Sequence, residues 1–191
     1  MSPELLAREG RRLFTAREVL RMAELGFFEG QHVELIDGEL RVVSPQGPPH
    51  MGAIGRLNRI LSLAYGPDHT VRVQGPVEVP DGLSLPEPDL AVVVTEGPWS
   101  RRHADCAETL LVVEVAVSSL AVDRRKAALY AEAGAPVYWL VEVERGRVVV
   151  HEGPRPDGAW SVVDVRDPLV LPGIGREVPV AEILPREDAA G

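Results

Sequence analysis

The chain is short of several residue types, and lysine is the most informative of them. Lys126 is the only lysine among 20 lysine and arginine residues in a chain of 191. Arginine suffices for surface charge and ion pairs, whereas lysine is a compact point charge whose pKa can be tuned to activate water. A single retained lysine is therefore a candidate for a specific task. Chance is the alternative, because a composition this poor in lysine leaves its last copy somewhere.

Cysteine and long apolar runs are scarce as well. Cys106 is the only cysteine, which excludes an internal disulfide framework and fits a reducing compartment. No segment reaches the roughly 18 apolar residues that a membrane helix needs. Residues 1–12 carry charges where a signal peptide has an apolar core. The sequence therefore predicts a soluble cytoplasmic protein that has no membrane partner.

Missing motifs exclude further kinds of chemistry. The five histidines show none of the H-x-x-x-H or H-x-H spacings of zinc sites. Phosphate-binding P-loops, dinucleotide fingerprints and G-x-S-x-G elbows do not occur either. A net charge of −9 argues against a protein that coats nucleic acid by bulk electrostatics. It is compatible with a nuclease, because an acidic metal site contributes negative charge that bound cations offset.

The overall composition is typical of a globular protein. The length predicts one domain over residues 1–191, in which residues 1–14 and 186–191 are expected to be loosely ordered. The pattern predicts an α/β (α+β) fold, in which helices flank a mixed sheet with one helical crossover. Turn signals, Asp37-Gly38 above all, predict β-hairpins near both ends of the chain. Thr15 and Glu18 match a capping box that opens a helix. Helices are predicted over 15–25, 50–65 and 120–133, and strands over 70–80, 90–94, 110–115, 136–143, 147–153 and 160–165.

Two carboxylates interrupt buried strand patterns, namely Asp89 and Glu114. A carboxylate in such a place is costly unless a cation or hydrogen bonds compensate it. If strands 90–94 and 110–115 pair as antiparallel neighbours, both carboxylates meet at one sheet edge. Lys126 follows Glu114 on the next helix and could point to the same place. Hard oxygen ligands of this kind suit Mg²⁺ or Mn²⁺, with water completing the shell.

Further motifs follow one another in a characteristic order along the chain. They are VELIDGEL at 33–40, Ser44-Pro45 with His50, PEPDL at 86–90, VEVAVSS at 113–119, Asp123 to Tyr130, and Gly134 with Tyr138-Trp139. This set resembles the PD-(D/E)XK nuclease superfamily, and within it the bacterial restriction-endonuclease branch called the Uma-two family. The usual motif has its lysine at the position of Ala116. In some branches the lysine lies on the following helix, and Lys126 fits that variant.

The resemblance implies a restriction-endonuclease-like fold and a Mg²⁺-dependent (or Mn²⁺-dependent) endonuclease that hydrolyses phosphodiester bonds in DNA. It implies that Asp89 and Glu114 hold the metal together with the Val115 carbonyl, and that Glu34 is an accessory ligand. Lys126 would then position or activate the attacking water. Asp89, Glu114 and Lys126 are thus the expected catalytic residues.

DNA is the expected partner, and arginines are candidates for contacts with its phosphates. These candidates are Arg101, Arg102, Arg124 and Arg125. Duplex cutting often needs two active sites, so a homodimer or a higher homo-oligomer is expected. The alternative is a catalytically inactive module that keeps the nuclease fold and acts in binding or assembly.

Each catalytic candidate also has an ordinary structural interpretation. Asp89 could cap a turn, Glu114 could pair with Arg124, and Lys126 could pair with Asp123 on an exposed helix face. A catalytic site instead requires the three side chains to converge in an accessible cleft.

Glu34 and His50 stay open at this point. A glutamate in a hairpin is usually solvated, and His50 is a residue at a helix start. Whether either belongs to the site depends on how these segments pack.

Overall fold

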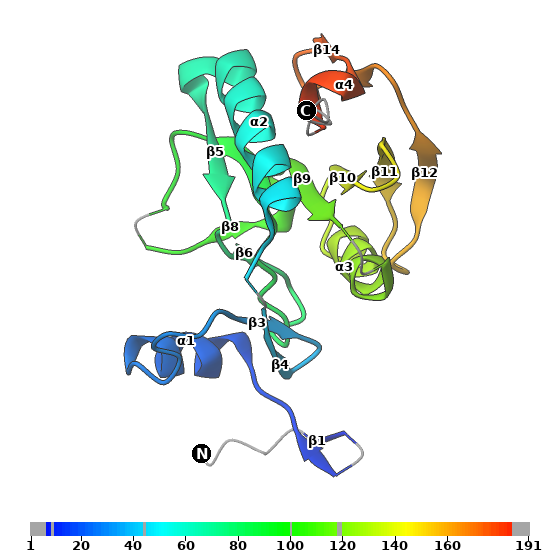
Figure 1. Cartoon of the computed structure of the whole chain (residues 1–191). Coiled ribbons are helices and arrows are strands. Elements are labelled where there is room, and N and C mark those ends of the chain that lie inside the picture. The colour runs from blue at the N-terminus through cyan, green and yellow to red at the C-terminus, as the bar shows by residue number, and fades with distance from the viewer. Residues whose placement is uncertain (1–6, 9, 44, 100, 118–119, 185–191) are drawn as a thin grey trace.

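The computed structural model of the chain describes residues 7–8, 10–43, 45–99, 101–117 and 120–184, with the backbone alone for 7, 8 and 120–124. A six-stranded sheet in the order β12-β11-β10-β9-β7-β5 forms its centre (Figure 1). These strands are β5 (His69–Val73), β7 (Leu90–Val94), β9 (Thr109–Ala116), β10 (Val137–Glu142), β11 (Arg147–Pro154) and β12 (Trp160–Val165). Only β9 and β10 pair in parallel among them, through a helical crossover. The predicted mixed sheet is confirmed.

The helices are α1 (Ala16–Glu24), α2 (Pro48–Tyr65), α3 (Leu120–Glu132) and α4 (Val180–Ile183), with short 3₁₀ turns at Gly66–Asp68 and Cys106–Glu108. Helices α2 and α4 pack on one face of the central sheet and α3 packs on the other, whereas α1 packs in a separate small cluster around Leu35. Along β9, Leu111 and Val113 pack toward α2, whereas Val112 packs toward α3. The strand is therefore buried on both sides, which is why its sequence is a continuous apolar run.

Short two-stranded sheets surround the centre. They are β1 (Ala7–Arg8) with β2 (Arg11–Arg12), β3 (Val33–Ile36) with β4 (Glu39–Val42), β6 (Val77–Glu78) with β8 (Ala104–Asp105), and β13 (Leu169–Val170) with β14 (Glu177–Val178). The β3–β4 turn uses Asp37 and Gly38, both at positive φ (53° and 79°), as the hairpin signal predicted. Leu35 of this hairpin bridges to Leu85, which attaches the hairpin beside the start of β7.

The prediction of one bent strand over residues 70–80 is wrong. The chain leaves the central sheet at Gln74, whose φ is 48°, and β6 then pairs with β8 in a separate sheet. Pro76 has no N–H to donate to a continuing ladder, which explains the break.

The end of the predicted loose lead-in, residues 1–14, contacts the rest of the domain. The Phe14 N–H donates to the Gly38 carbonyl at 2.8 Å, and Phe14 packs against the small apolar cluster around Leu35. The lead-in is thus held by the hairpin near its end. Residues 1–6, 9 and 186–191 of the predicted loose ends lie outside the described residues.

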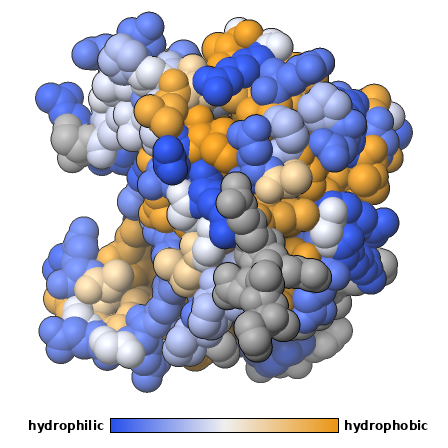
Figure 2. All heavy atoms as spheres, turned by 45° about the horizontal axis from the view of Figure 1, so that its top comes forward, coloured by the Kyte–Doolittle hydropathy of each residue, from blue (hydrophilic) through white to orange (hydrophobic). Residues whose placement is uncertain are grey.

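Hydrophobic residues reach the surface in several separate patches (Figure 2). Among the described residues, no helix combines the length and apolar character that crossing a membrane requires. One exposed apolar side chain, Val42 of β4, is 72% exposed and lies at the cleft described next.

Candidate metal and catalytic site

The antiparallel pairing of β7 with β9 brings two carboxylates to one sheet edge. Leu90 pairs with Val113, so one further step along both strands places Asp89 opposite Glu114. The Val115 N–H donates to Asp89 Oδ2 at 2.8 Å. Asp89 and Glu114 are both buried, as the apolar strand patterns around them predicted.

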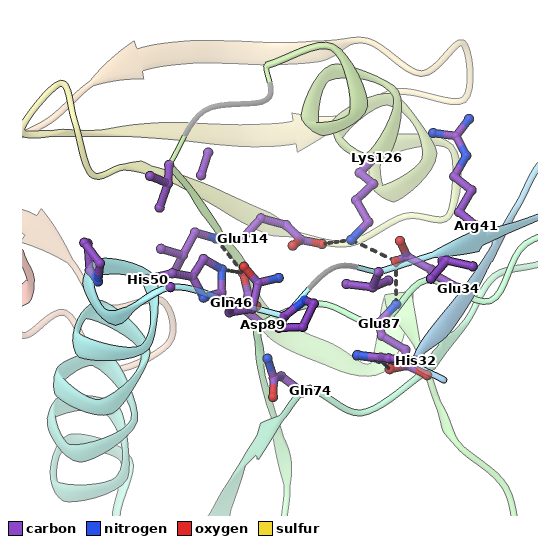
Figure 3. A pocket seen from close by; sticks show the side chains of 18 residues that line it. His32, Glu34, Arg41, Gln46, His50, Gln74, Glu87, Asp89, Glu114 and Lys126 are labelled. Carbon is purple, nitrogen blue, oxygen red and sulfur yellow. Dashed lines mark hydrogen bonds and ion pairs between the residues drawn. The ribbon is translucent and has the colours of Figure 1, made fainter. Parts of the chain in front are cut away.

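Lys126 reaches this edge from α3. Its Nζ lies 2.8 Å from Glu114 Oε1 and 2.8 Å from Glu34 Oε1 (Figure 3). Tyr130, one helical turn later, donates its hydroxyl to the same Glu114 oxygen at 2.7 Å. Lys126 is only 7% exposed, so the interpretation as a solvated helix-face lysine is wrong. The side chains of Asp123 and Arg124 lie outside the described residues.

Glu34 is buried rather than solvated, because its hairpin docks beside the start of β7. Its Oε1 accepts a hydrogen bond from the Glu87 N–H at 2.9 Å in addition to its contact with Lys126. The Glu87 side chain in turn contacts His32 Nε2 at 2.5 Å. Glu34 is thus arranged to hold Lys126 from the side opposite Glu114.

His50 joins the cluster from the start of α2. Its Nε2 lies 3.1 Å from Asp89 Oδ2, and its Nδ1 has no hydrogen-bond partner among the described residues. Burial lowers the pKa of His50, but the hydrogen bond to Asp89 and the charges of Asp89 and Glu114 outweigh burial and raise that pKa above its usual value. The sequence feature that pointed to His50 was its place shortly after Ser44-Pro45.

The site holds more buried carboxylates than buried cations. Glu34, Asp89 and Glu114 face the single ammonium of Lys126. Burial raises the pKa of Glu114 to about 7; Lys126 opposes this rise, and Asp89 and Glu34 add to it. Burial also lowers the pKa of Lys126, but Glu114 and Glu34 outweigh it and raise that pKa. Lys126 is therefore charged at neutral pH, and the excess negative charge favours binding of a further cation.

The donor set at this edge suits a hard divalent cation. Among the described residues, Asp89 Oδ1 and Glu114 Oε2 accept no hydrogen bond, so one oxygen of each carboxylate is available. No group of three or more histidine, cysteine, aspartate or glutamate side chains in the described part of the chain is arranged to hold a metal. A cation would therefore combine two carboxylates with main-chain oxygen, such as the Val115 carbonyl, and water. Mg²⁺ accepts such a shell.

These groups line an open cleft of about 570 Å³. The lining residues are His32, Glu34, Arg41, Val42, Val43, Pro45, Gln46, Gly47, Pro49, His50, Gln74, Glu87, Asp89, Glu114, Val115, Ala116, Val117 and Lys126. The structure thus brings Asp89, Glu114 and Lys126 together in one accessible place.

Three of the predicted phosphate-binding arginines, Arg101, Arg102 and Arg125, lie outside the cleft, whereas the side chain of the fourth, Arg124, lies outside the described residues. Arg102 pairs with Glu108 at 2.6 and 2.7 Å, and Arg125 pairs with Asp37 at 2.5 and 2.8 Å. Neither these two nor Arg101 lines the cleft, and their contacts with phosphate stay a prediction.

Arg41 was not singled out from the sequence, yet it is the arginine that lines the cleft among the described residues. It stands opposite Glu34 in the β3–β4 ladder. The position of Arg41 opposite Glu34 in the predicted hairpin was the sequence feature that could have indicated this.

The raised pKa of Glu114 predicts how stability depends on pH without metal. Because its folded pKa is about 7 and its ordinary value is 4.5, the folded state binds more protons between these values. Glu114 therefore makes the free energy of unfolding fall as pH rises from about 4.5 to about 7, by on the order of 3 kcal/mol. Urea unfolding in EDTA across this range would measure the fall. A flat profile would contradict the shift.

Comparison with known proteins identifies the family. The model of the Uma2 family, described as putative restriction endonuclease, matches residues 16–181. The crystal structure of a putative nuclease belonging to DUF820 from Anabaena variabilis ATCC 29413 superposes with a TM-score of 0.67 at 15% identity, over 89% of this chain and 97% of that chain. No curated protein matches the chain. Since the structural likeness supports the fold and the family model spans most of the sequence, the chain belongs to the Uma2 family of putative restriction endonucleases.

Proposed function

We propose that this chain is an endonuclease that hydrolyses phosphodiester bonds in DNA with Mg²⁺ or Mn²⁺ as its cofactor. The observation that carries the proposal is the convergence of Asp89, Glu114 and Lys126 in one open cleft with an excess of buried carboxylates. Family membership supports nuclease chemistry in general. Metal dependence and the DNA substrate rest on the donor set and on the resemblance.

Each residue has a defined task in this proposal. Asp89 and Glu114 would hold the cation, which would neutralise charge on the phosphate and lower the pKa of the attacking water. Lys126 is charged, so it acts as a fixed positive group that orients the attacking water and stabilises negative charge on the phosphate. Glu34 and Tyr130 are positioning residues, because Glu34 holds Lys126 and Tyr130 fixes Glu114. Glu34 is proposed in this role rather than as a third carboxylate ligand, since no three carboxylate, histidine or cysteine side chains among the described residues are arranged to hold a metal.

Metal binding is the first prediction of the proposal. Titration calorimetry with Mn²⁺ should show binding to the wild type and at least tenfold weaker binding to Asp89→Ala and to Glu114→Ala, because each variant removes one of two carboxylate ligands. Glu108→Ala is the matched control, since Glu108 is a surface carboxylate paired with Arg102. Equal loss of affinity in all three variants would indicate nonspecific binding of Mn²⁺.

Cleavage is then tested on supercoiled plasmid DNA, single-stranded DNA and RNA in parallel. Lys126→Ala should keep Mn²⁺ binding but lose turnover. A wild type that binds Mn²⁺ and cuts none of these substrates would contradict the proposal and favour the inactive module. The proposed homodimer is checked separately by sedimentation equilibrium.

A further inference from the structure

A second cavity of about 460 Å³ adjoins the catalytic cleft and differs from it in chemistry. We call it the amide cavity; its lining is Gly30, Gln31, His32, Val42, Val43, Pro45, Gln46, Met51 and Gln74. None of these residues is an acid, a lysine or an arginine, whereas the catalytic cleft contains four carboxylates. Its volume lies within the roughly 300–1,000 Å³ of small-molecule sites. Apart from His32, whose Nε2 contacts the Glu87 carboxylate, the lining is uncharged, so the amide cavity is suited to a neutral group rather than to a phosphate.

The amide cavity opens directly into the catalytic cleft, since six of its nine lining residues line both, and Gln46 and Gln74 are the two glutamines among these six. Both are exposed, and within the described part of the chain neither carboxamide has a hydrogen-bond partner. Figure 3 shows Gln46 next to Asp89 and Gln74 below them in the view. Their donors and acceptors are therefore available to a ligand.

The backbone ties these glutamines to the proposed metal ligand. The Gln74 N–H donates to the Asp89 carbonyl at 3.1 Å. Gln46 precedes the start of α2, which supplies the contact from His50 to Asp89. A ligand held by the two carboxamides would thus lie next to the reacting centre.

Gln74 also adopts a strained conformation. With Asp37 it is one of two non-glycine residues at positive φ among those described, and Asp37 is explained by its hairpin turn. Glutamine has no intrinsic preference for this region, so its position costs free energy of conformation. Strain of this kind concentrates at functional sites, where the fold holds a side chain in one place.

The walls of the amide cavity suit a flat, partly apolar group. Val42 and Met51 are 72% and 48% exposed, so both present apolar surface to a ligand. A carboxamide offers a donor and an acceptor side by side, which is the pattern that pairs with adenine. In the described part of the cleft, only Arg41 and Lys126 offer strongly basic side chains, too few for the two phosphate rows of a duplex.

We infer that the amide cavity is a nucleobase subsite, which takes an unpaired base beside the scissile phosphate, adenine in preference, through Gln46 and Gln74. The inference rests on the proposed function and specifies its substrate as an unpaired stretch of DNA. The apolar walls contact the base, while Gln46 and Gln74 read its polar edge.

The test is fluorescence anisotropy with labelled oligo(dA), oligo(dT) and the dA·dT duplex, each in Ca²⁺. The wild type should bind oligo(dA) about tenfold more tightly than oligo(dT), and both more tightly than the duplex. Gln46→Ala and Gln74→Ala should each bring the dA/dT ratio close to one while Mn²⁺ affinity stays unchanged. Val73→Ala is the matched control, because Val73 is exposed, adjoins Gln74 and lines neither cavity.

The Gln74→Gly variant distinguishes the effect of the glutamine side chain from the effect of backbone strain at this position. This variant should be more stable than Gln74→Ala, because glycine tolerates positive φ, yet it should lose base preference to the same extent. Equal binding of oligo(dA) and oligo(dT) by the wild type would overturn the inference, and so would a ratio that survives in both alanine variants. Cleavage of DNA without base preference would support the proposed function and overturn the nucleobase subsite. Preferential adenine binding without any cleavage would support the subsite and contradict the proposed function.

Discussion

Lys126→Met should lower the free energy of unfolding by about 3–5 kcal/mol at pH 8, the cost of leaving buried charge without a partner. Methionine has a similar length but no charge, so Glu34 and Glu114 would remain buried at 6% exposure without their cation. Protonation relieves this repulsion, and the destabilisation should therefore shrink toward pH 5. Urea unfolding at the two pH values would measure both effects. Cleavage should fall by about 10²–10³-fold, since a preorganised positive group is lost.

Arg125→Met is the matched control for this variant. Arg125 precedes Lys126 on α3 and pairs with Asp37 and Glu132, but all three side chains are about one-third exposed. Partly exposed ion pairs contribute at most about 1 kcal/mol, so the control should be mildly destabilised and nearly independent of pH over this range. Equal destabilisation of the two variants would show that loss of helix packing, and not of charge, governs the result.

Glu114→Gln should raise stability at pH 8 by about 1–3 kcal/mol while abolishing metal binding and cleavage. The carboxylate of Glu114 has a pKa raised to about 7, so the folded protein disfavours its charged form above that pH. Glutamine removes the charge, keeps the shape and can still accept from Tyr130, and Lys126 retains Glu34 as its partner. The substitution is then favourable because it removes a buried charge that Asp89 and Glu34 repel.

The two variants thus have opposite predicted effects, although they alter the two partners of one ion pair. This asymmetry follows from the charge balance. Lys126 keeps Glu34 as a partner when Glu114 is neutralised, whereas Glu34 and Glu114 share Lys126 as their only buried ammonium among the described residues and both lose it when Lys126 is replaced. Glu108→Gln on the surface is the control for the change of functional group. Destabilisation by Glu114→Gln comparable to that of Lys126→Met would refute this account of the charge balance.

Strand patterns predicted the centre of the site because their consequences are local and geometric. A charge in an apolar run must be compensated, and antiparallel pairing of 90–94 with 110–115 leaves Asp89 and Glu114 side by side. Lys126 was singled out because lysine is so rare in this chain. It was placed near the site because its helix connects two parallel strands and must therefore pack back over the sheet. These features depend on neighbouring strands and on one crossover helix, and not on the packing of distant segments.

Other members depended on tertiary docking, which no local pattern shows. Glu34 stands at a position of the alternating hairpin pattern where a side chain is usually solvated. It is buried only because the hairpin docks at Leu85. Arg41 reaches the cleft for the same reason. Gln74 was hidden within a strand pattern, since the exit of the chain at this residue depends on the pairing of β6 with β8.

The contacts of Lys126 have a consequence for the newly made chain. The cluster around it draws on residues 34, 87–89, 114 and 126, so its members are separated by up to 92 positions (126 − 34). β10, which follows α3, must also insert between β9 and β11 to complete the central sheet. A ribosome-bound chain that ends before Lys126 lacks the only lysine, and therefore cannot assemble the proposed catalytic group. Synthesis would then yield a polypeptide without this cluster until more than half of the domain has emerged.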